Sequence, residues 1–205
     1  MTRAARERLA AAIRTLVAHA VEAELEGPDS ERASEALEKV VADLDSLPRR
    51  GPKNPTKPEF EDLQTNFGYD PIIGYSNPIA PPVDVRFDEN NVLHGHANLD
   101  RQYEGPPGYV HGAVVAGIFD LLLGLANAVA GNQGMTGTLT IKYLRPTPLK
   151  TDLHIVARVL KTEGRKSFTS GEIYAGDTLC AECEGLFIAL TPEMGAELFP
   201  NLNRG

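Results

Sequence analysis

The chain has 205 residues, 42% of them apolar, which suits an ordinary soluble protein with one sizeable core. Its formal net charge of -8 excludes a long-range attraction of the whole molecule to nucleic acid or to an anionic membrane. An anionic ligand must therefore be met by a local group of basic side chains.

Two amphipathic helices are predicted near the N-terminus. Apolar side chains recur at helical spacing over residues 9–25 and again over 33–44, on either side of a break at Gly27. A targeting peptide is the alternative, but Glu7 and Arg14 interrupt the apolar run and leave no hydrophobic region of the secretory type. We therefore expect structural helices, and the cytoplasm as the compartment.

Prolines are concentrated in the next segment, because eight of the fifteen lie between Pro48 and Pro82. Such a density excludes regular secondary structure over most of this span. We therefore divide the chain into a helical extension over residues 1–47, a linker over 48–77 that crosses the domain surface, and a domain over 78–205.

The rest of the chain is predicted to be a hairpin, a long helix and four more strands. Residues 83–88 alternate between apolar and polar side chains, and a turn at residues 89–91 leads into a second strand. Residues 110–131 are apolar on every side and too long for a strand, which indicates a buried helix. The later strands lie in GTLTIKYL, DLHIVARVL, KSFTSGEIYA and TLCAECEGLFIAL, with a turn at Glu163-Gly164-Arg165.

This order predicts an α+β fold in which a curved antiparallel sheet wraps around one central helix, since both must bury their apolar faces. A transmembrane span is the alternative for residues 110–131, because their length is nearly sufficient. Asp120 at the centre would cost roughly 2.5 to 3.5 kcal/mol in hydrocarbon, and no basic cluster flanks the segment. We therefore predict no membrane span.

The cysteines and histidines do not predict a metal site. Cys180 and Cys183 are three apart in a strand, which sends them to opposite faces and favours structural thiols over a metal or redox pair. His94 and His96 share one strand face at a spacing that permits metal binding, but no third ligand is evident. A solvated strand face is the preferred interpretation for both, and for His154.

Asp120 is the strongest candidate for chemistry. It is the only acidic or basic residue between Glu104 and Lys142, and it lies in the middle of the predicted buried helix. A carboxylate there is either half of a hidden structural pair or a working acid or base. Its helix face carries small side chains, which either form a trough for a ligand or let another backbone approach. These are Ala113, Ala116, Gly117, Gly124 and Asn127.

The start of the same helix is a second candidate. A constrained loop, Gly105 to Gly108, leads to His111 and Gly112, so free N–H groups and the helix dipole point outward and suit a developing oxyanion. Gly112 and Asp120 are about 12 Å apart along one helix, so one chain cannot bring both to one carbonyl. Two antiparallel helices of a two-fold dimer would.

The segments QYEGPPGYVHGAVVAGIFD, MTGTLTIKYLRPTPL and KTEGRKSF resemble the hotdog-fold acyl-CoA thioesterases of the phenylacetate-pathway type, over about residues 78–191. The resemblance implies a hotdog fold, an acyl-CoA substrate, a homodimer or dimer of dimers, and no cofactor beyond the coenzyme A of the substrate. In that family the catalytic acid follows the histidine of an HGG motif at the spacing of His111 and Asp120. Asp120 would then act as general base or nucleophile, while the Gly112 amide polarises the carbonyl.

Other residues take roles from the same resemblance. Thr136 matches a hydroxyl that positions water in several members, although a turn hydroxyl is an equal alternative. His111 would position rather than transfer protons, and Ala113 replaces the second glycine of HGG, where its methyl narrows the space for substrate. The expected phosphate or pantetheine contacts are Lys142, Arg165 and Lys166, which otherwise are the basic side chains of an exposed strand edge.

The predicted function is hydrolysis of an acyl-CoA thioester at a dimer interface. One alternative is a hotdog module that binds acyl-CoA without turning it over, as a sensor or part of an assembly. A hydratase or dehydratase ranks behind both, because it needs a paired acid and histidine near one helix start and Asp120 lies deep in the helix. The N-terminal helices fall outside the resemblance and would cover the groove or contact another subunit.

Overall fold

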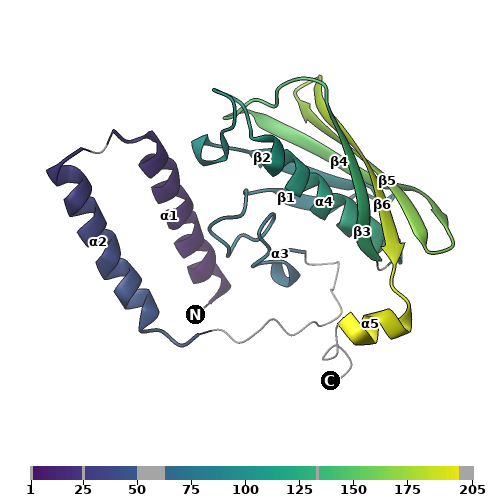
Figure 1. Ribbon diagram of the computed structural model, residues 1–205, viewed down its shortest axis with the longest axis horizontal. Coiled ribbons are helices and arrows are strands. Elements are labelled where there is room, and N and C mark those ends of the chain that lie inside the picture. The colour runs from purple at the N-terminus through teal and green to yellow at the C-terminus, as the bar shows by residue number, and fades with distance from the viewer. Residues whose placement is uncertain (1, 25, 50–62, 133, 199–205) are drawn as a thin grey trace.

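The computed structural model describes residues 2–24, 26–49, 63–132 and 134–198. A six-stranded antiparallel sheet curves around helix α4, and helices α1 and α2 lie side by side at one end of the molecule (Figure 1). The predicted α+β architecture is therefore confirmed. The elements are α1 (Arg3–Glu22), α2 (Pro28–Asp45), α3 (Leu63–Asn66), β1 (Asp84–Phe87), β2 (Leu93–Asn98), α4 (Gly112–Val129), β3 (Gly134–Tyr143), β4 (Asp152–Glu163), β5 (Lys166–Ala175), β6 (Thr178–Ala189) and α5 (Pro192–Leu198).

The sheet has the order β1-β2-β4-β5-β6-β3, so β3 follows α4 in the chain yet forms the far edge of the sheet. Two glycines let the strands approach the helix closely. A Cβ on Gly95 would lie 2.9 Å from Leu122, and one on Gly171 would lie 2.9 Å from Phe119. Because side chains are absent at these two points, the sheet wraps tightly around α4.

Left-handed backbone conformations close the predicted hairpins. Asn91 has a φ of 58° in the turn between β1 and β2, and Gly164 has the same φ between β4 and β5. Glycine reaches this region at no steric cost, and asparagine tolerates it better than most residues. The turns expected at residues 89–91 and 163–165 are therefore confirmed.

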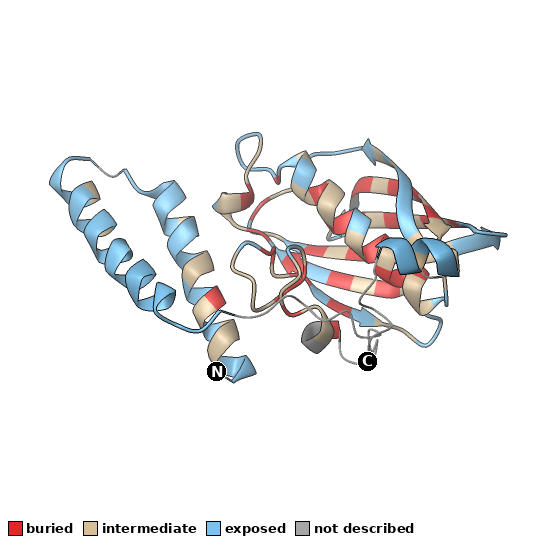
Figure 2. Ribbon diagram, turned by 60° about the horizontal axis from the view of Figure 1, so that its bottom comes forward, coloured by how far each residue is buried: buried red, intermediate tan, exposed pale blue. Residues whose placement is uncertain are grey.

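Helix α4 is the core helix of the domain. By length and composition it is apolar enough to cross a membrane, but 44% of it is buried inside the fold. Its fully buried side chains face the concave side of the sheet, where buried residues from both layers meet (Figure 2). The largest of them are Phe119, Ile118, Leu122 and Leu123.

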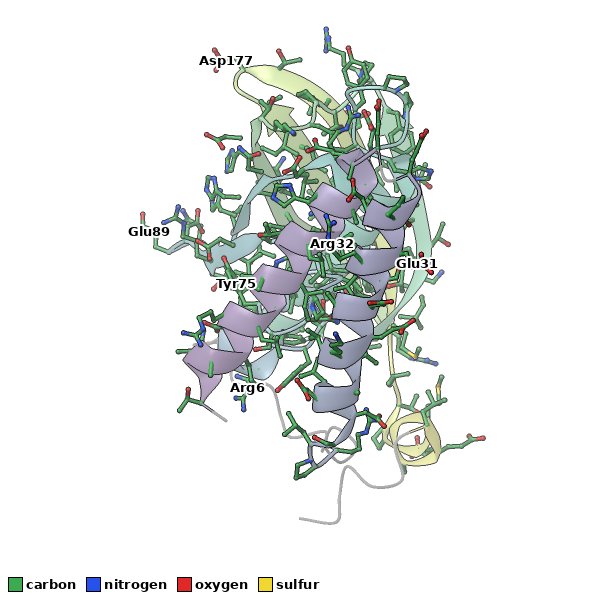
Figure 3. The ribbon with its side chains drawn as sticks, turned by 90° about the vertical axis from the view of Figure 1, so that its left-hand side faces the viewer. Arg6, Glu31, Arg32, Tyr75, Glu89 and Asp177 are labelled. Atoms are coloured by element: carbon green, nitrogen blue, oxygen red, sulfur yellow. The ribbon has the colours of Figure 1, made fainter. Side chains whose placement is uncertain are left out.

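Helix α1 packs on the domain, whereas α2 does not. Ala10 of α1 is 2% exposed, and the Arg14 guanidinium donates to the carbonyl oxygens of Asn77 at 2.9 Å and Tyr75 at 3.3 Å. Helix α2 has no buried residue and is exposed along its length (Figure 2). Figure 3 shows α1 and α2 from this side, with Arg6 on α1 and Glu31 and Arg32 on α2.

The segment expected to cross the surface as a linker contributes to the core. Leu63 and Ile73 belong to the central apolar cluster, and Ile73 is only 1% exposed. The Asp70 carboxylate accepts hydrogen bonds from the N–H groups of Ile72 and Ile73 at 2.7 and 3.1 Å, which fixes this turn. Residues 50–62 of the expected linker lie outside the described residues.

Candidate active site

The Asp120 carboxylate and the Thr136 hydroxyl meet at the centre of α4. Thr136 Oγ1 donates a hydrogen bond to Asp120 Oδ1 at 2.7 Å. The register of β3 against β6 shifts between Thr136 and Thr138, at a bulge at this point of the edge strand. The structure therefore brings these two predicted residues into direct contact.

The expected burial of Asp120 is wrong for the single chain. Asp120 is exposed, although its neighbours Phe119 and Leu122 are completely buried. Asp120 lies beside β3, at the edge where the sheet ends, so its carboxylate remains in water. The carboxylate thus avoids the desolvation penalty that burial within apolar surroundings would impose.

The small side chains around Asp120 have two different environments. A Cβ on Gly117 would lie 2.9 Å from Ile72, and one on Gly124 would lie 3.6 Å from Phe187. At these two positions the small residue makes room for a packed side chain. Ala113 remains exposed, so the trough is open only along part of the helix.

The helix start leaves one backbone donor open. His111 is the N-cap, its Nδ1 accepting from the Ala113 N–H at 3.0 Å and its carbonyl accepting from the N–H groups of Val114 and Val115. Among the described residues, none accepts a hydrogen bond from the Gly112 N–H. A helix start with one free N–H and a positive dipole end is suited to an oxyanion.

Tyr143 contributes to this helix start and was not predicted. Its hydroxyl donates to the Gly112 carbonyl oxygen at 3.0 Å, which ties the end of β3 to the first turn of α4. Tyr143 itself is 56% exposed. No spacing in the sequence indicates this contact, because it joins residues from separate elements.

The thiol of Cys183 is buried in the core, close enough to Asp120 for that carboxylate to affect its pKa. Burial, and then the negative charge of Asp120, raises the pKa of the Cys183 thiol to about 11. Cys180 is also buried, and both thiols are free. A neutral buried thiol is a poor nucleophile, so Cys183 is not suited to attack a substrate.

The three predicted coenzyme A contacts do not gather into one patch. Lys142 binds Glu182 with an N–O distance of 2.8 Å, and the hydrogen bond to that carboxylate raises the pKa of the lysine. Arg165 donates from Nε to the carbonyl oxygen of Ala189 at 2.9 Å, and Lys166 follows it in the chain. Lys142 pairs with Glu182 of β6, whereas Lys166 pairs with Ile188, six residues farther along that strand.

The segment that carries α4 is similar to a known protein family and to known enzymes. Residues 107–182, which contain α4 and most of the strands after it, match the model of the thioesterase superfamily. The acyl-coenzyme A thioesterase THEM4 of Mus musculus is 40% identical over 92 residues, and that of Xenopus laevis is 41% identical over 91 residues. These matches cover 44% and 43% of this chain. The chain spans only about two fifths of the length of these curated relatives, at 40% and 41%.

A solved structure extends the similarity to nearly the whole chain. A protein described as a thioesterase superfamily protein is 33% identical to this chain and superposes with a TM-score of 0.79. The match covers 89% of this chain and 90% of that one, so the similarity extends well beyond residues 107–182. The fold is accordingly the hotdog fold of these enzymes, and the chain belongs to the thioesterase superfamily.

Proposed function

We propose that this protein hydrolyses an acyl-CoA thioester to coenzyme A and a carboxylic acid. The observation that carries the proposal is the exposed Thr136–Asp120 hydrogen bond on the same helix that begins with an open Gly112 N–H. One group can activate water and the other can stabilise an oxyanion. The naming of the curated relatives as acyl-coenzyme A thioesterases supports the substrate class.

Two copies of the chain share the proposed site. Gly112 and Asp120 lie in one α4, about 12 Å apart along its axis, which is too far for both to act on one carbonyl. A second α4 running antiparallel to the first would place its Asp120 beside the first Gly112. The active assembly is then a homodimer, or a dimer of such dimers.

The edge strand β3 supports this pairing. It has ten residues and, within the described parts of the chain, pairs with β6 on one side only, and its apolar side chains Met135 and Tyr143 are 51% and 56% exposed. Long exposed edges with apolar side chains are normally covered. Two β3 strands paired about a two-fold axis would continue the sheet and bring the two α4 helices together.

In the proposed reaction, Asp120 of the second copy takes a proton from water as the water oxygen attacks the thioester carbon. The carbonyl oxygen becomes an oxyanion that accepts from the Gly112 N–H. The carbonyl re-forms as the carbon–sulfur bond breaks, and the Asp120 proton passes to the leaving thiolate. Thr136 holds the carboxylate, while His111 keeps the first turn capped and needs no proton transfer of its own.

Attack by the Asp120 carboxylate itself is the alternative route. It would form a mixed anhydride and release coenzyme A, and water would then open the anhydride. After a single turnover in ¹⁸O-water, label in the Asp120 carboxylate would establish the anhydride route, because it arises only when water opens the anhydride at that carbon. Label in the product alone is expected for the general base and also for water attack at the other carbon of the anhydride, so only a labelled protein decides between the routes.

The coenzyme A contacts, the absence of a further cofactor and the compartment belong to the same proposal. Lys142, Arg165 and Lys166 are the proposed phosphate or pantetheine contacts, with Lys142 paired with Glu182 in the free chain. The reaction uses no cofactor besides the coenzyme A of the substrate. We place it in the cytoplasm, where free thiols such as Cys180 and Cys183 stay reduced.

The test is release of coenzyme A from short, long and aromatic acyl-CoAs, followed with a thiol reagent. We expect Asp120→Asn to lower the rate by about 10²- to 10⁴-fold while acyl-CoA binding survives. Thr136→Ser retains the hydroxyl and serves as the control for Thr136→Ala. Acyl-CoA binding by the native protein without release would favour the non-catalytic module, and water addition to an enoyl thioester would favour the hydratase.

A further inference from the structure

Three of the five histidines gather on the face of the sheet that points away from α4. Gly95 faces Leu122 of α4, so its strand neighbours His94 and His96 point to the opposite face. The antiparallel register of β2 and β4 places His154 directly beside His96. The third imidazole that the sequence did not indicate is thus supplied by the fold.

His94 and His154 meet nitrogen to nitrogen. His94 Nδ1 lies 3.0 Å from His154 Nε2, and the two ring planes are within 3° of parallel. The ring centroids are 5.3 Å apart, much farther than the facing nitrogens, so the rings meet edge to edge. His96 lies against His154 with a centroid separation of 4.9 Å.

The carboxylate of Asp88 lies next to the His94 ring. Asp88 Oδ2 lies 3.5 Å from His94 Nε2, on the side of the ring opposite His154. Asp88 Oδ1 accepts from the N–H groups of Asn90 at 2.8 Å and Val92 at 2.9 Å, which holds the carboxylate in place. Glu89, which lies between Asp88 and Asn90 in the chain, projects outward at the tip of this turn (Figure 3).

We propose that His94 Nδ1 and His154 Nε2 bind a divalent transition-metal ion, with water in the other positions and Asp88 as the outer carboxylate. Histidine ligands of metals usually donate their second ring N–H to such a carboxylate, which sets the tautomer. Without metal, the same two nitrogens share one proton in an N–H···N hydrogen bond. The ion would replace that shared proton once both rings turn away from the in-line arrangement, so that the two lone pairs converge on it.

The type of ligand indicates the class of ion. The facing nitrogens are 3.0 Å apart, which is a hydrogen-bond distance, so both rings must turn before their lone pairs converge on one ion about 2.0 to 2.1 Å from each nitrogen. Square-planar or tetragonal sites with nitrogen ligands suit Cu²⁺ and Ni²⁺. Among the residues that the structure describes, no group of three histidine, cysteine or carboxylate side chains is arranged for a metal, so the site is a two-histidine one.

The surrounding charges are mixed. Arg86 pairs with His94 across β1 and β2, and Asp84 pairs with His96 in the same way. The two carboxylates of Asp84 and Asp88 therefore outnumber the single guanidinium next to the site. His94 and Asp88 keep 29% and 34% of their side-chain surface accessible, so an ion can enter from solvent.

The test is calorimetric titration of the full chain, without an affinity tag, using CuCl₂, NiCl₂ and ZnCl₂ separately. We expect one copper ion per chain, bound more tightly than nickel or zinc. His94→Gln and His154→Gln should each abolish that binding, whereas Asp88→Asn should weaken it about tenfold because the imidazoles remain. His19→Gln, which changes a histidine of α1, is the matched control and should leave the affinity unchanged.

Equal copper affinity in the native protein and the His94→Gln/His154→Gln double variant would overturn the proposal. Circular dichroism of each variant confirms that the sheet is intact, and Asp88→Asn provides a second reading because asparagine keeps an oxygen acceptor for Asn90 and Val92. Acyl-CoA hydrolysis measured on the same samples should be unchanged, since the histidines lie on the face away from α4. The outcome is therefore separate from the test of hydrolysis.

Discussion

Helices α4 and α2 both have 18 residues, but α4 contributes buried side chains to the core and α2 contributes none. α4 is apolar on nearly every side and packs against five strands, with His111 capping its start. α2 has a one-sided apolar stripe, no side-chain cap and no buried residue. The difference shows that periodicity predicts a helix in both cases, whereas the surroundings decide whether its apolar face contributes to stability.

The exposed stripe of α2 is substantial. Leu37 and Leu44 are 39% and 37% exposed, and Val40 and Val41 are 49% and 64% exposed. Such a stripe usually faces a partner element. Within the described residues only α1 joins this end of the molecule to the sheet domain, through Arg14, ion pairs of Glu22 with Lys150 and Arg101, and an apolar contact around Ala10.

The largest expected effect lies in α4. Leu122 is fully buried and packs on Gly95 of β2, so Leu122→Ala should lower the free energy of unfolding by about 2 to 5 kcal/mol. Urea unfolding followed by circular dichroism measures this change. Leu122→Met nearly preserves the volume and should cost less than about 1.5 kcal/mol. Similar losses for both variants would mean that cavity formation is not the cause.

The contact between α1 and the sheet domain should show the next largest effect. Arg14→Ala removes charge-assisted hydrogen bonds to the carbonyls of Tyr75 and Asn77, which should weaken docking of α1 by roughly 1.5 to 3 kcal/mol. Hydrogen exchange should then accelerate in α1 while β4 and β5 stay protected. Arg8→Ala, an exposed change on the same helix, is the control, and equal acceleration in both variants would contradict the assignment.

A smaller effect is expected at the start of α4. Tyr143→Phe removes the hydroxyl that donates to the Gly112 carbonyl, a change of about 0.5 to 1.5 kcal/mol. We expect kcat/KM for the best acyl-CoA to fall by roughly two- to tenfold. Tyr109→Phe removes an exposed hydroxyl of the preceding loop and should leave the rate unchanged. A rate for Tyr143→Phe equal to the native value would show that this bond does not position Gly112.

The smallest effect is expected in α2. Val41→Ala should change the free energy of unfolding by no more than about 0.5 kcal/mol, because the side chain is already 64% exposed. The same denaturation experiment at several protein concentrations provides the measurement. A loss above 1 kcal/mol that grows with protein concentration would instead show that another copy of the chain covers this stripe.

Much of the fold and part of the site could be predicted from the sequence. Period-two alternation, turn residues such as Gly164 and the all-apolar segment at α4 are local signals, and each predicted its element. The spacing of His111 and Asp120 likewise identified the helix that carries the candidate residues. The exposure of Asp120 could not be read in this way, because the apolar neighbours that surround it in sequence lie on the other side of the helix in space.

By itself, the sequence determined the order of strands and helices and the residue types offered for chemistry, because these depend on short-range spacing and backbone preferences. Only the tertiary structure decided that Thr136 reaches Asp120, that Tyr143 holds the first turn of α4, and that His94 faces His154. Each of these contacts joins residues that are 16 to 60 positions apart, and its geometry depends on strand register and on the packing of α4 against the sheet. No local pattern encodes that register, since it arises only when the whole apolar face is buried at once.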